Sequence, residues 1–361
     1  MRLWGIIMNF KFLNKKISGI LSVVPNHCVK FSDEIGNYGF SKEKCLSLQK
    51  VMGFDERRIV AGNECASDLC LFGLEYLFER NLLDRDDIDA LIFITQTPDH
   101  LIPPTSSVLH GRLGLGREVL CFDINHGCTG YLYGLLQAFL LLEHPGVNKV
   151  VLLNGDTLSR CACPKDRNIY PLIGDAGTIS VVEHAEVSED IFLNLRMDGS
   201  RSDWLTVPAG AFRMPSTEET RKVRVLQDGN QRSDEHFHMN GPGIFTFSQT
   251  DVPDGIKALF GFASAETDEI DYFMFHQPNR FMLKKLARKL NVPEEKMPNN
   301  VVGKFGNSSS ASIPVAICHN ISRRLLKEQM RICMSGFGVG LSWGALIMGL
   351  GPLEFCGLIE K

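Results

Sequence analysis

The sequence predicts an α/β protein built from two related halves, each a sheet layered with helices. One observation is a set of short, wholly apolar runs, which are typical of strands buried on both faces. A second is the helical spacing of apolar residues in the segments between these runs. A third is an internal echo: a strand, a polar glycine-containing corner and a helix rich in small residues occur around Cys128 and again around Asn307.

Composition excludes several classes of protein. The 361 residues are long enough for two core-bearing units, and 44% hydrophobic with 22% charged residues is ordinary for a soluble globular chain. A net charge of -4 gives no reason to expect nucleic acid or a membrane surface as partner, and no apolar stretch is long enough to span a bilayer. Eleven cysteines without framework spacing, and no convincing export signal, favour reduced thiols in the cytoplasm.

The first half is expected to begin after an N-terminal extension, with Met8 as an alternative start to Met1. Apolar runs predict strands, and periodic segments with caps predict helices. We expect Ser67 or an adjacent polar residue to cap a helix at 65–78. The expected order is a strand at 16–24, helices at 42–52 and 65–78, a strand at 90–95, a helix at 105–113, the corner at Cys128, and strands at 149–153 and 174–183.

The rest of the chain is expected to resume a regular pattern only after residue 240. Residues 184–240 read as solvated loops, in which His236 and His238 fit one face of a strand as easily as a ligand pair. Pro278 is expected to open a helix. The expected order is a helix at 243–263, a strand at 270–275, helices at 281–290 and 308–321, a strand at 331–335, a glycine-rich bend at 336–340 and a last strand at 341–350. The predicted units are therefore 16–190, a connecting region 191–240, and 241–361.

The corner at Cys128 is the first candidate for chemistry. The apolar run 119–122 ends in a glycine-flanked corner, and helical spacing begins at Tyr131, so Cys128 is predicted at a strand-to-helix turn. The unpaired N–H groups and the dipole of a helix start favour a thiolate. Gly127 and Gly130 would let backbone or substrate approach the sulfur closely. A small buried structural cysteine is the alternative.

Two further polar corners follow predicted strands. His276 ends the strand 270–275 within the letters HQPN, and Asn307 lies in GKFGN. Ends of strands and starts of helices are where α/β folds gather reacting groups, although a structural histidine and a turn asparagine are the alternatives for each alone. The pair Cys161 and Cys163 offers too few ligands for a metal site. The three corners together, in this order, form a specific signal.

With these corners in place, the sequence resembles the β-ketoacyl-acyl carrier protein synthase III family of the thiolase superfamily. The resemblance runs from about residue 16 to residue 350. It implies a thiolase-like five-layered α-β-α-β-α sandwich of two duplicated halves, and a homodimer. The motifs that carry it are TPDHLIPPTSS (97–107), DINHGCTGYLYGL (123–135), GDAG (174–177), FHQPN (275–279), GNSSSAS (306–312) and GFGVGLSWG (336–344).

The resemblance assigns roles to the three corners. Cys128 corresponds to the acyl-accepting cysteine, and His276 and Asn307 to the paired groups that stabilise an enolate. The backbone N–H groups of Cys128 and Val339 would form the oxyanion hole. The implied reaction transfers an acyl group from a thioester to Cys128 and condenses it with malonyl-acyl carrier protein, with loss of CO2, as in fatty acid biosynthesis. It needs no metal and no cofactor beyond the thioester on coenzyme A or carrier.

The resemblance also identifies substrate contacts and differences. Arg167 corresponds to a nucleotide-contacting arginine, and Phe337 and Gly338 belong to the substrate-contacting bend. The segment 31–58 lacks the family tryptophan that stacks on the adenine of coenzyme A, which leaves room for an acyl carrier protein as acyl donor. Val339 replaces a glycine and adds bulk beside the acyl site, so the primer and its chain length stay open.

The helix after His276 is the expected docking site for a carrier protein. Arg280 lies one position before the family's carrier-binding arginine, where this chain has Phe281, while Arg288 and Lys289 match the family's basic pair. A basic face can attract an acidic partner, although a solvated surface is the alternative. The whole face comprises Arg280, Lys284, Lys285, Arg288 and Lys289.

Two rival functions remain open from the sequence. A related enzyme would keep acyl-Cys128 but transfer the acyl group to an alcohol or amine without decarboxylation. A non-catalytic subunit could pair with an active homologue, although it would be expected to lose at least one of the three corners. A Cys-His hydrolase is disfavoured, because no carboxylate is evident that would orient the histidine.

Overall fold

Two sheets carry most of the strands in the computed structural model, which describes residues 8–187 and 189–361. The six-stranded sheet has the order β17 (Phe355–Glu360), β2 (Lys15–Val24), β8 (Ala176–His184), β7 (Lys149–Asp156), β5 (Ala90–Ile94) and β6 (Leu120–Ile124). The five-stranded sheet has the order β1 (Asn9–Phe12), β9 (Ile191–Met197), β16 (Ser342–Leu350), β15 (Met330–Gly338) and β14 (Tyr272–Phe275).

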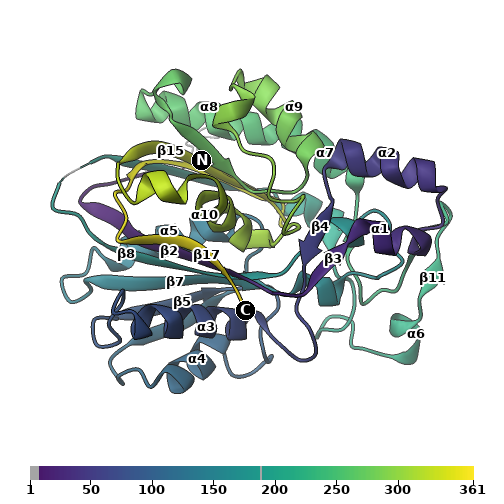
Figure 1. The fold of residues 1–361 in the computed structure, drawn as a ribbon, viewed down its shortest axis with the longest axis horizontal. Helices are drawn as coiled ribbons and strands as arrows, with labels where there is room; N and C mark the ends of the chain where they lie inside the picture. Colours follow the sequence, from purple (N-terminus) through teal and green to yellow (C-terminus); the bar gives the residue numbers. More distant parts are fainter. Residues whose placement is uncertain (1–7, 188) are drawn as a thin grey trace, which may run out of the picture.

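Helices occupy the segments between these strands. The longer ones are α2 (Lys42–Met52), α3 (Ala66–Glu79), α4 (Thr105–Leu113), α5 (Gly130–Leu141), α7 (Gly241–Gln249), α8 (Asp251–Ala263), α9 (Arg280–Leu290) and α10 (Ser312–Leu325). The shorter elements are α1 (Phe31–Glu34), α6 (Glu218–Arg221), and the strand pairs β3 (Cys28–Lys30) with β4 (Glu56–Arg58), β10 (Leu205–Thr206) with β13 (His238–Met239), and β11 (Arg224–Val225) with β12 (Gln231–Arg232). Those labelled in Figure 1, which are α1, α6, β3, β4 and β11, lie at one end of the molecule, on the right.

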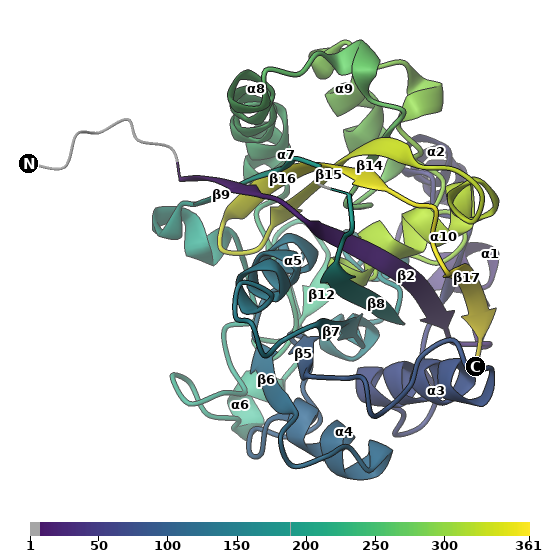
Figure 2. The ribbon, with the colours of Figure 1, turned by 90° about the vertical axis from the view of Figure 1, so that its left-hand side faces the viewer.

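Three apolar clusters hold the elements in five layers, which Figure 2 shows edge on. The central cluster packs α5 and α10 between the two sheets. The second places α7, α8 and α9 on the outer face of the five-stranded sheet, and the third places α3 and α4 on the outer face of the six-stranded sheet. The predicted α-β-α-β-α sandwich is confirmed. Within the described residues, no helix combines the length and the apolar character needed to cross a membrane.

The expectation of solvated loops over 184–240 is wrong for β9. This strand lies inside the five-stranded sheet and pairs with β1 and β16 in antiparallel register. Asn194 in its middle obscured the apolar pattern, yet its amide is fully buried and satisfied. Its Nδ2 donates to Gly255 O at 2.8 Å, and its Oδ1 accepts from Ala345 N at 3.1 Å. A paired asparagine therefore ties the sheet to α8.

The two ends of the described chain also differ from expectation. The strand 341–350 is not the last, because β17 follows it and pairs in parallel with β2 in the other sheet. Near the N-terminus, the segment expected as an extension contains β1, which pairs with β9. Residues 1–7 lie outside the described residues, so the choice between Met1 and Met8 stays a prediction. So does the division at residues 190 and 240, although each sheet draws strands from both sides of it.

Three helix boundaries were predicted wrongly. The single helix over 243–263 is broken at Thr250 into α7 and α8, because Pro253 has no N–H to give the preceding turn and its ring crowds that turn. The helix α9 begins after Asn279, whose Oδ1 caps Met282 N at 2.8 Å, and Pro278 stays outside it. The cap of α3 is Cys65 rather than Ser67.

We predict that Asn194→Ala lowers the free energy of unfolding by about 2 to 4 kcal/mol, because a buried carbonyl and a buried N–H both lose their partner. The urea midpoint and the melting temperature measure this change. The control is Asn300→Ala, which removes an exposed amide bonded to Asn320 and should change stability by less than about 0.5 kcal/mol. Equal effects of the two variants would contradict the role given to Asn194.

Candidate active site

Cys128 lies where β6 turns into α5, one residue before the helix N-cap Thr129. Its residue surface is only 8% exposed, because the end of β15 packs directly on it. A Cβ added at Gly338 would lie 2.7 Å from Cys128 Sγ, and one at Gly336 would lie 2.8 Å from Cys128 O. Only glycine fits at these positions. The bend predicted at 336–340 begins later than expected, since β15 runs to Gly338.

A hydroxyl network fixes the bend that follows β15 against the start of α5. The Thr129 hydroxyl lies 2.8 Å from Ser342 Oγ, and the Ser342 hydroxyl donates to Val339 O at 2.7 Å. The carbonyl of Val339 is thereby held on the side of Ser342, while its N–H interacts with the Cys128 thiol. The backbone N–H of Cys128 also lowers the pKa of its own thiol. Both backbone N–H groups thus lower the pKa of the Cys128 thiol, against the effect of burial.

Burial dominates the protonation of Cys128. It raises the pKa of the thiol to about 11, and the N–H groups of Val339 and Cys128 only partly offset this. The expectation that the helix start favours a thiolate therefore fails for the free protein, because the loss of solvation outweighs the peptide dipoles. Cys128 is therefore a neutral thiol at neutral pH.

His276 follows β14 and is 2% exposed. Its Nδ1 lies 2.7 Å from Ser312 Oγ, which also accepts from Gln277 N at 3.3 Å. Since Gln277 supplies a proton to that oxygen, the Ser312 hydroxyl can give its own proton to Nδ1, which leaves the ring proton on Nε2. Burial lowers the pKa of His276 to about 3, so the imidazole is neutral at physiological pH. The edge of the ring meets Phe337, with centroids 5.6 Å apart.

Asn307 is held by its backbone and by one side of its amide. Its N–H donates to Leu172 O at 2.6 Å, and its carbonyl accepts from Gly174 N at 3.1 Å. Its Oδ1 accepts from Ser309 N at 3.0 Å, which leaves the Nδ2 protons to face the cavity. The loop of Gly174 approaches so closely that a Cβ there would lie 1.8 Å from Phe305 O. This contact explains the glycine that opens the GDAG motif.

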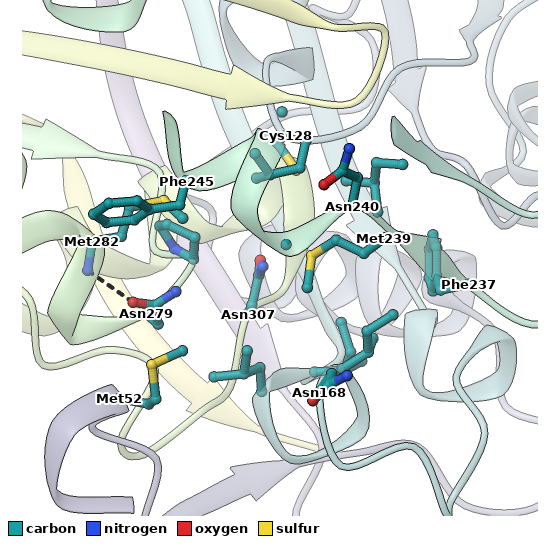
Figure 3. A pocket seen from close by; sticks show the side chains of 18 of the residues that line it. Met52, Cys128, Asn168, Phe237, Met239, Asn240, Phe245, Asn279, Met282 and Asn307 are labelled. Atoms are coloured by element: carbon teal, nitrogen blue, oxygen red, sulfur yellow. Dashed lines mark hydrogen bonds between the residues drawn. The ribbon is translucent and has the colours of Figure 1, made fainter. Parts of the chain in front are cut away.

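Cys128, His276 and Asn307 line one cavity of about 790 Å³. Figure 3 shows Cys128 and Asn307 directed into it from different parts of the chain. Of the other predicted site residues, the cavity is also lined by Arg167, Phe337, Gly338 and Val339. Its walls are mainly apolar and aromatic, with Phe237, Met239, Ile244, Phe245, Phe247 and Met282 among them.

The predicted basic residues of α9 lie away from this cavity. Arg280 is packed at the junction with α2, where a Cβ on Gly53 would touch its side chain at 2.6 Å. Arg288 and Lys289 are exposed on the last turn of the helix. Phe281 at the first turn lines the cavity, so the basic pair lies about 10 Å further along the helix axis. The structure therefore separates the basic pair from the reacting groups.

Arg167 and Arg232 are the two cations that line the cavity in the described part of the chain, and both are already paired. Arg167 forms an ion pair with Asp228 at 3.4 Å, donates to the Asp228 carbonyl, and stacks on the ring of Phe40 at 4.4 Å. Arg232 pairs with the buried Asp166 at 3.2 Å. Each guanidinium is thus already neutralised by an aspartate.

Sequence reasoning missed several residues around the site. Ser312 orients the imidazole, and its only signal was the run of small polar residues after Asn307. Gln96 lines the cavity from the loop after β5, where nothing in the sequence distinguished it from an ordinary loop residue. His236, which the sequence left open as a ligand, accepts a hydrogen bond at Nδ1 from Ser233 N at 3.0 Å. No group of three or more candidate metal ligands occurs among the described residues.

Comparison with known proteins identifies the family of this chain. The family model for 3-oxoacyl-[acyl-carrier-protein] synthase III matches residues 122–199, and the model for its C-terminal part matches residues 262–350. A putative 3-oxoacyl-[acyl-carrier-protein] synthase 3 of Campylobacter jejuni is 32% identical over 347 residues, which cover 96% of this chain and 97% of the relative. A β-ketoacyl-[acyl-carrier-protein] synthase III of Chlamydia caviae is 32% identical, covering 82% and 86%.

Solved structures show the same likeness. The crystal structure of a 3-oxoacyl-(acyl-carrier protein) synthase from Burkholderia xenovorans superposes with a TM-score of 0.91 at 34% identity, covering 98% of this chain and 99% of that one. A synthase III from Pseudomonas aeruginosa shares the fold at 24% identity, with a TM-score of 0.78 and coverage of 94% and 98%. The chain belongs to the 3-oxoacyl-[acyl-carrier-protein] synthase III family of the thiolase superfamily, a family of condensing acyltransferases.

Proposed function

We propose that the protein catalyses a decarboxylating Claisen condensation of an acyl thioester with malonyl-acyl carrier protein. The observation that carries this proposal is the convergence of a thiol, a neutral imidazole and a free carboxamide in one apolar cavity. An acyl chain suits such walls, and each of the three groups matches one chemical demand of the two half-reactions.

In the first half-reaction, Cys128 Sγ attacks the carbonyl carbon of the donor thioester. The oxygen of the tetrahedral intermediate accepts hydrogen bonds from the N–H groups of Cys128 and Val339, each worth about 3 kcal/mol. The carbon–sulfur bond to the donor then breaks, and the donor leaves as a thiol with the proton that Cys128 gives up. The acyl group remains on Cys128, so one difficult step is divided into two easier ones.

In the second half-reaction, the bond between the α-carbon and the carboxylate of the malonyl thioester breaks. CO2 leaves, and the electron pair of that bond stays on the thioester as an enolate. His276 Nε2 and Asn307 Nδ2 donate to the enolate oxygen, and both donors are uncharged in the buried site. The carbanion attacks acyl-Cys128, and the β-ketoacyl product leaves on its carrier as the cysteine sulfur is released. No metal or further cofactor takes part in this scheme.

We further propose an acyl carrier protein, rather than coenzyme A, as the preferred acyl donor. The phosphates of a nucleotide need unpaired cations, and Arg167 and Arg232 are both engaged by aspartates. The stacking position over Arg167 is taken by Phe40. Leu48 of α2, 36% exposed, also lines the cavity.

We propose the cytoplasm as the location of the protein, because eleven cysteines without framework spacing suit a reducing compartment.

We expect His276→Ala and Asn307→Asp each to lower condensation at least about 100-fold, while acylation of Cys128 changes less than about threefold, because only the enolate loses a donor. Intact-mass spectrometry with acyl thioesters on coenzyme A and on carrier measures acylation, and release of CO2 from malonyl carrier measures the second step. The control is Asn240→Asp, an exposed cavity residue whose role as cap of α7 an aspartate preserves.

The same assays separate the rival functions. Survival of both half-reactions in either variant would refute the roles given to His276 and Asn307. Stable acyl-Cys128 without CO2 release, discharged by an alcohol or amine, would establish the alternative acyltransferase. Failure of every thioester to acylate Cys128 would identify a non-catalytic subunit.

We propose that the carrier docks on α9 through Arg288 and Lys289. Reversing both charges, as Arg288→Glu with Lys289→Glu, should raise the apparent KM for the carrier about tenfold with little change in kcat. The reason is that attraction between a basic face and an acidic partner mainly raises the rate of association. Added salt should shrink the difference. The matched control is Arg323→Glu with Lys327→Glu on and after α10, which is also exposed. An equal KM effect of the two double variants would remove α9 as the docking site.

We also propose a homodimer that forms along β6. This strand is the edge of the six-stranded sheet, and Leu120 on it is 48% exposed. An open strand edge with apolar side chains is a surface that proteins normally cover. Sedimentation velocity should give twice the chain mass, and Leu120→Lys should shift the protein towards monomer. A wild-type monomer at micromolar concentration would contradict the proposal.

A further inference from the structure

Asp156 is a buried carboxyl group behind the wall of the cavity. It ends β7 and is 0% exposed. Its Oδ1 accepts from Gln96 N at 2.7 Å, from Thr95 Oγ1 at 3.2 Å and from Thr97 Oγ1 at 3.3 Å. One carboxylate oxygen therefore binds three consecutive residues of the turn that follows β5.

That turn forms part of the wall beside the nucleophile. Thr157 N donates to Thr97 Oγ1 at 2.9 Å, so the turn is joined to the end of β7 at a second point. The side chain of Gln96 is pressed against the corner before Cys128, since a Cβ on Gly127 would lie 2.3 Å from Gln96 Oε1. Gln96 and Cys128 line the same cavity.

The second oxygen of Asp156 has neither a hydrogen bond nor a salt bridge among the described residues. Asp156 Oδ2 is buried without a hydrogen-bond partner among the described residues, and so is the Ser309 hydroxyl. The Ser309 side chain lowers the pKa of both the Asp156 carboxyl and the Cys128 thiol, so the two groups share one polar neighbour. The short turn Ser309–Ala311 packs on β7. No cation is among the main influences on Asp156.

We propose that Asp156 is a positioning residue for the nucleophile: it holds the turn of Gln96 against the Cys128 corner and places a buried negative charge behind the thiol. The inference rests on the proposed role of Cys128 as nucleophile. The charge of Asp156 would add to burial in lowering the thiolate fraction of Cys128, and so its reactivity towards adventitious electrophiles.

The titration of the two groups is then linked. Burial raises the pKa of Asp156 to about 6, against hydrogen bonds that lower it, so the group is ionised at neutral pH. Its charge acts in the same direction as burial on the pKa of Cys128. The other titratable groups that feel this charge are the thiols Cys70 on α3 and Cys161 after β7. His276, with a pKa lowered to about 3 by burial, stays neutral above pH 5.

The test is the rate at which iodoacetamide alkylates Cys128 between pH 5 and 9, followed on the Cys128 peptide by mass spectrometry. In the wild type, the logarithm of the rate should rise by one per pH unit below the Asp156 titration and flatten around pH 6, where Asp156 ionises. It should then rise again on a parallel line at a lower rate, because the charge raises the pKa of the thiol by a fixed amount. Asp156→Asn keeps an acceptor for Gln96 N and loses the charge. It should give a straight line of slope one and alkylate Cys128 at least fivefold faster at pH 7.5.

Asp175→Asn is the matched control. Asp175 is also fully buried and accepts from Val60 N and Ser159 N, yet it is not among the main influences on Cys128. Its profile should overlay that of the wild type. A wild-type profile without a flattening, or an Asp156→Asn profile equal to it, would overturn the proposal, and the wild-type measurement decides even if the variant does not fold. Alkylation reads the thiol directly, so this result is independent of whether condensation occurs.

The proposal that Asp156 holds the turn of Gln96 is tested separately, by the KM for the acyl donor. Asp156→Ala removes the acceptor as well as the charge, so it should raise the KM for the acyl donor at least fivefold above that of Asp156→Asn. Equal KM values in the two variants would show that the turn of Gln96 does not depend on Asp156.

Discussion

The active site depends on one close approach, in which the backbone at the end of β15 lies directly on the Cys128 corner. Side chains at Gly336 or Gly338 would push the two apart, because each Cβ would come within 2.8 Å of Cys128. The contact joins a strand of the five-stranded sheet to the loop that leaves the six-stranded sheet. Through it the N–H of Val339 reaches the sulfur, and Phe337 reaches the imidazole.

The same packing keeps the reacting groups uncharged before substrate arrives. Cys128 is held as a thiol and His276 as a neutral imidazole, both chiefly by burial. In the proposed reaction, charge would then appear only on atoms of the substrate, first on a thioester oxygen and then on an enolate oxygen. Fixed neutral donors at those positions would need little reorganisation as the charge develops. The burial that gives the cavity its low dielectric also keeps both side chains neutral.

The sequence predicted the layered architecture and the three corners, because both depend on local patterns. An apolar run such as Ala90–Ile94 and a glycine-flanked corner such as that of Cys128 are visible without tertiary information. It failed where a tertiary partner reverses the local signal. Asn194 reads as a loop residue until Gly255 and Ala345 are seen to satisfy it, and the charge on Cys128 could not be judged before its burial was known. The supporting residues Gln96 and Ser312 carry no motif of their own, since their roles are set by neighbours distant in sequence.

The interleaving of strands has a consequence for how the chain folds during synthesis. The outer strand of the six-stranded sheet is β17, made from Phe355–Glu360, and it covers the edge of β2 from Lys15–Val24. More than three hundred residues are therefore translated while that edge is still uncovered. Until β17 is made, β2 pairs only with β8 and exposes its other edge, where a strand of another chain could add to the sheet.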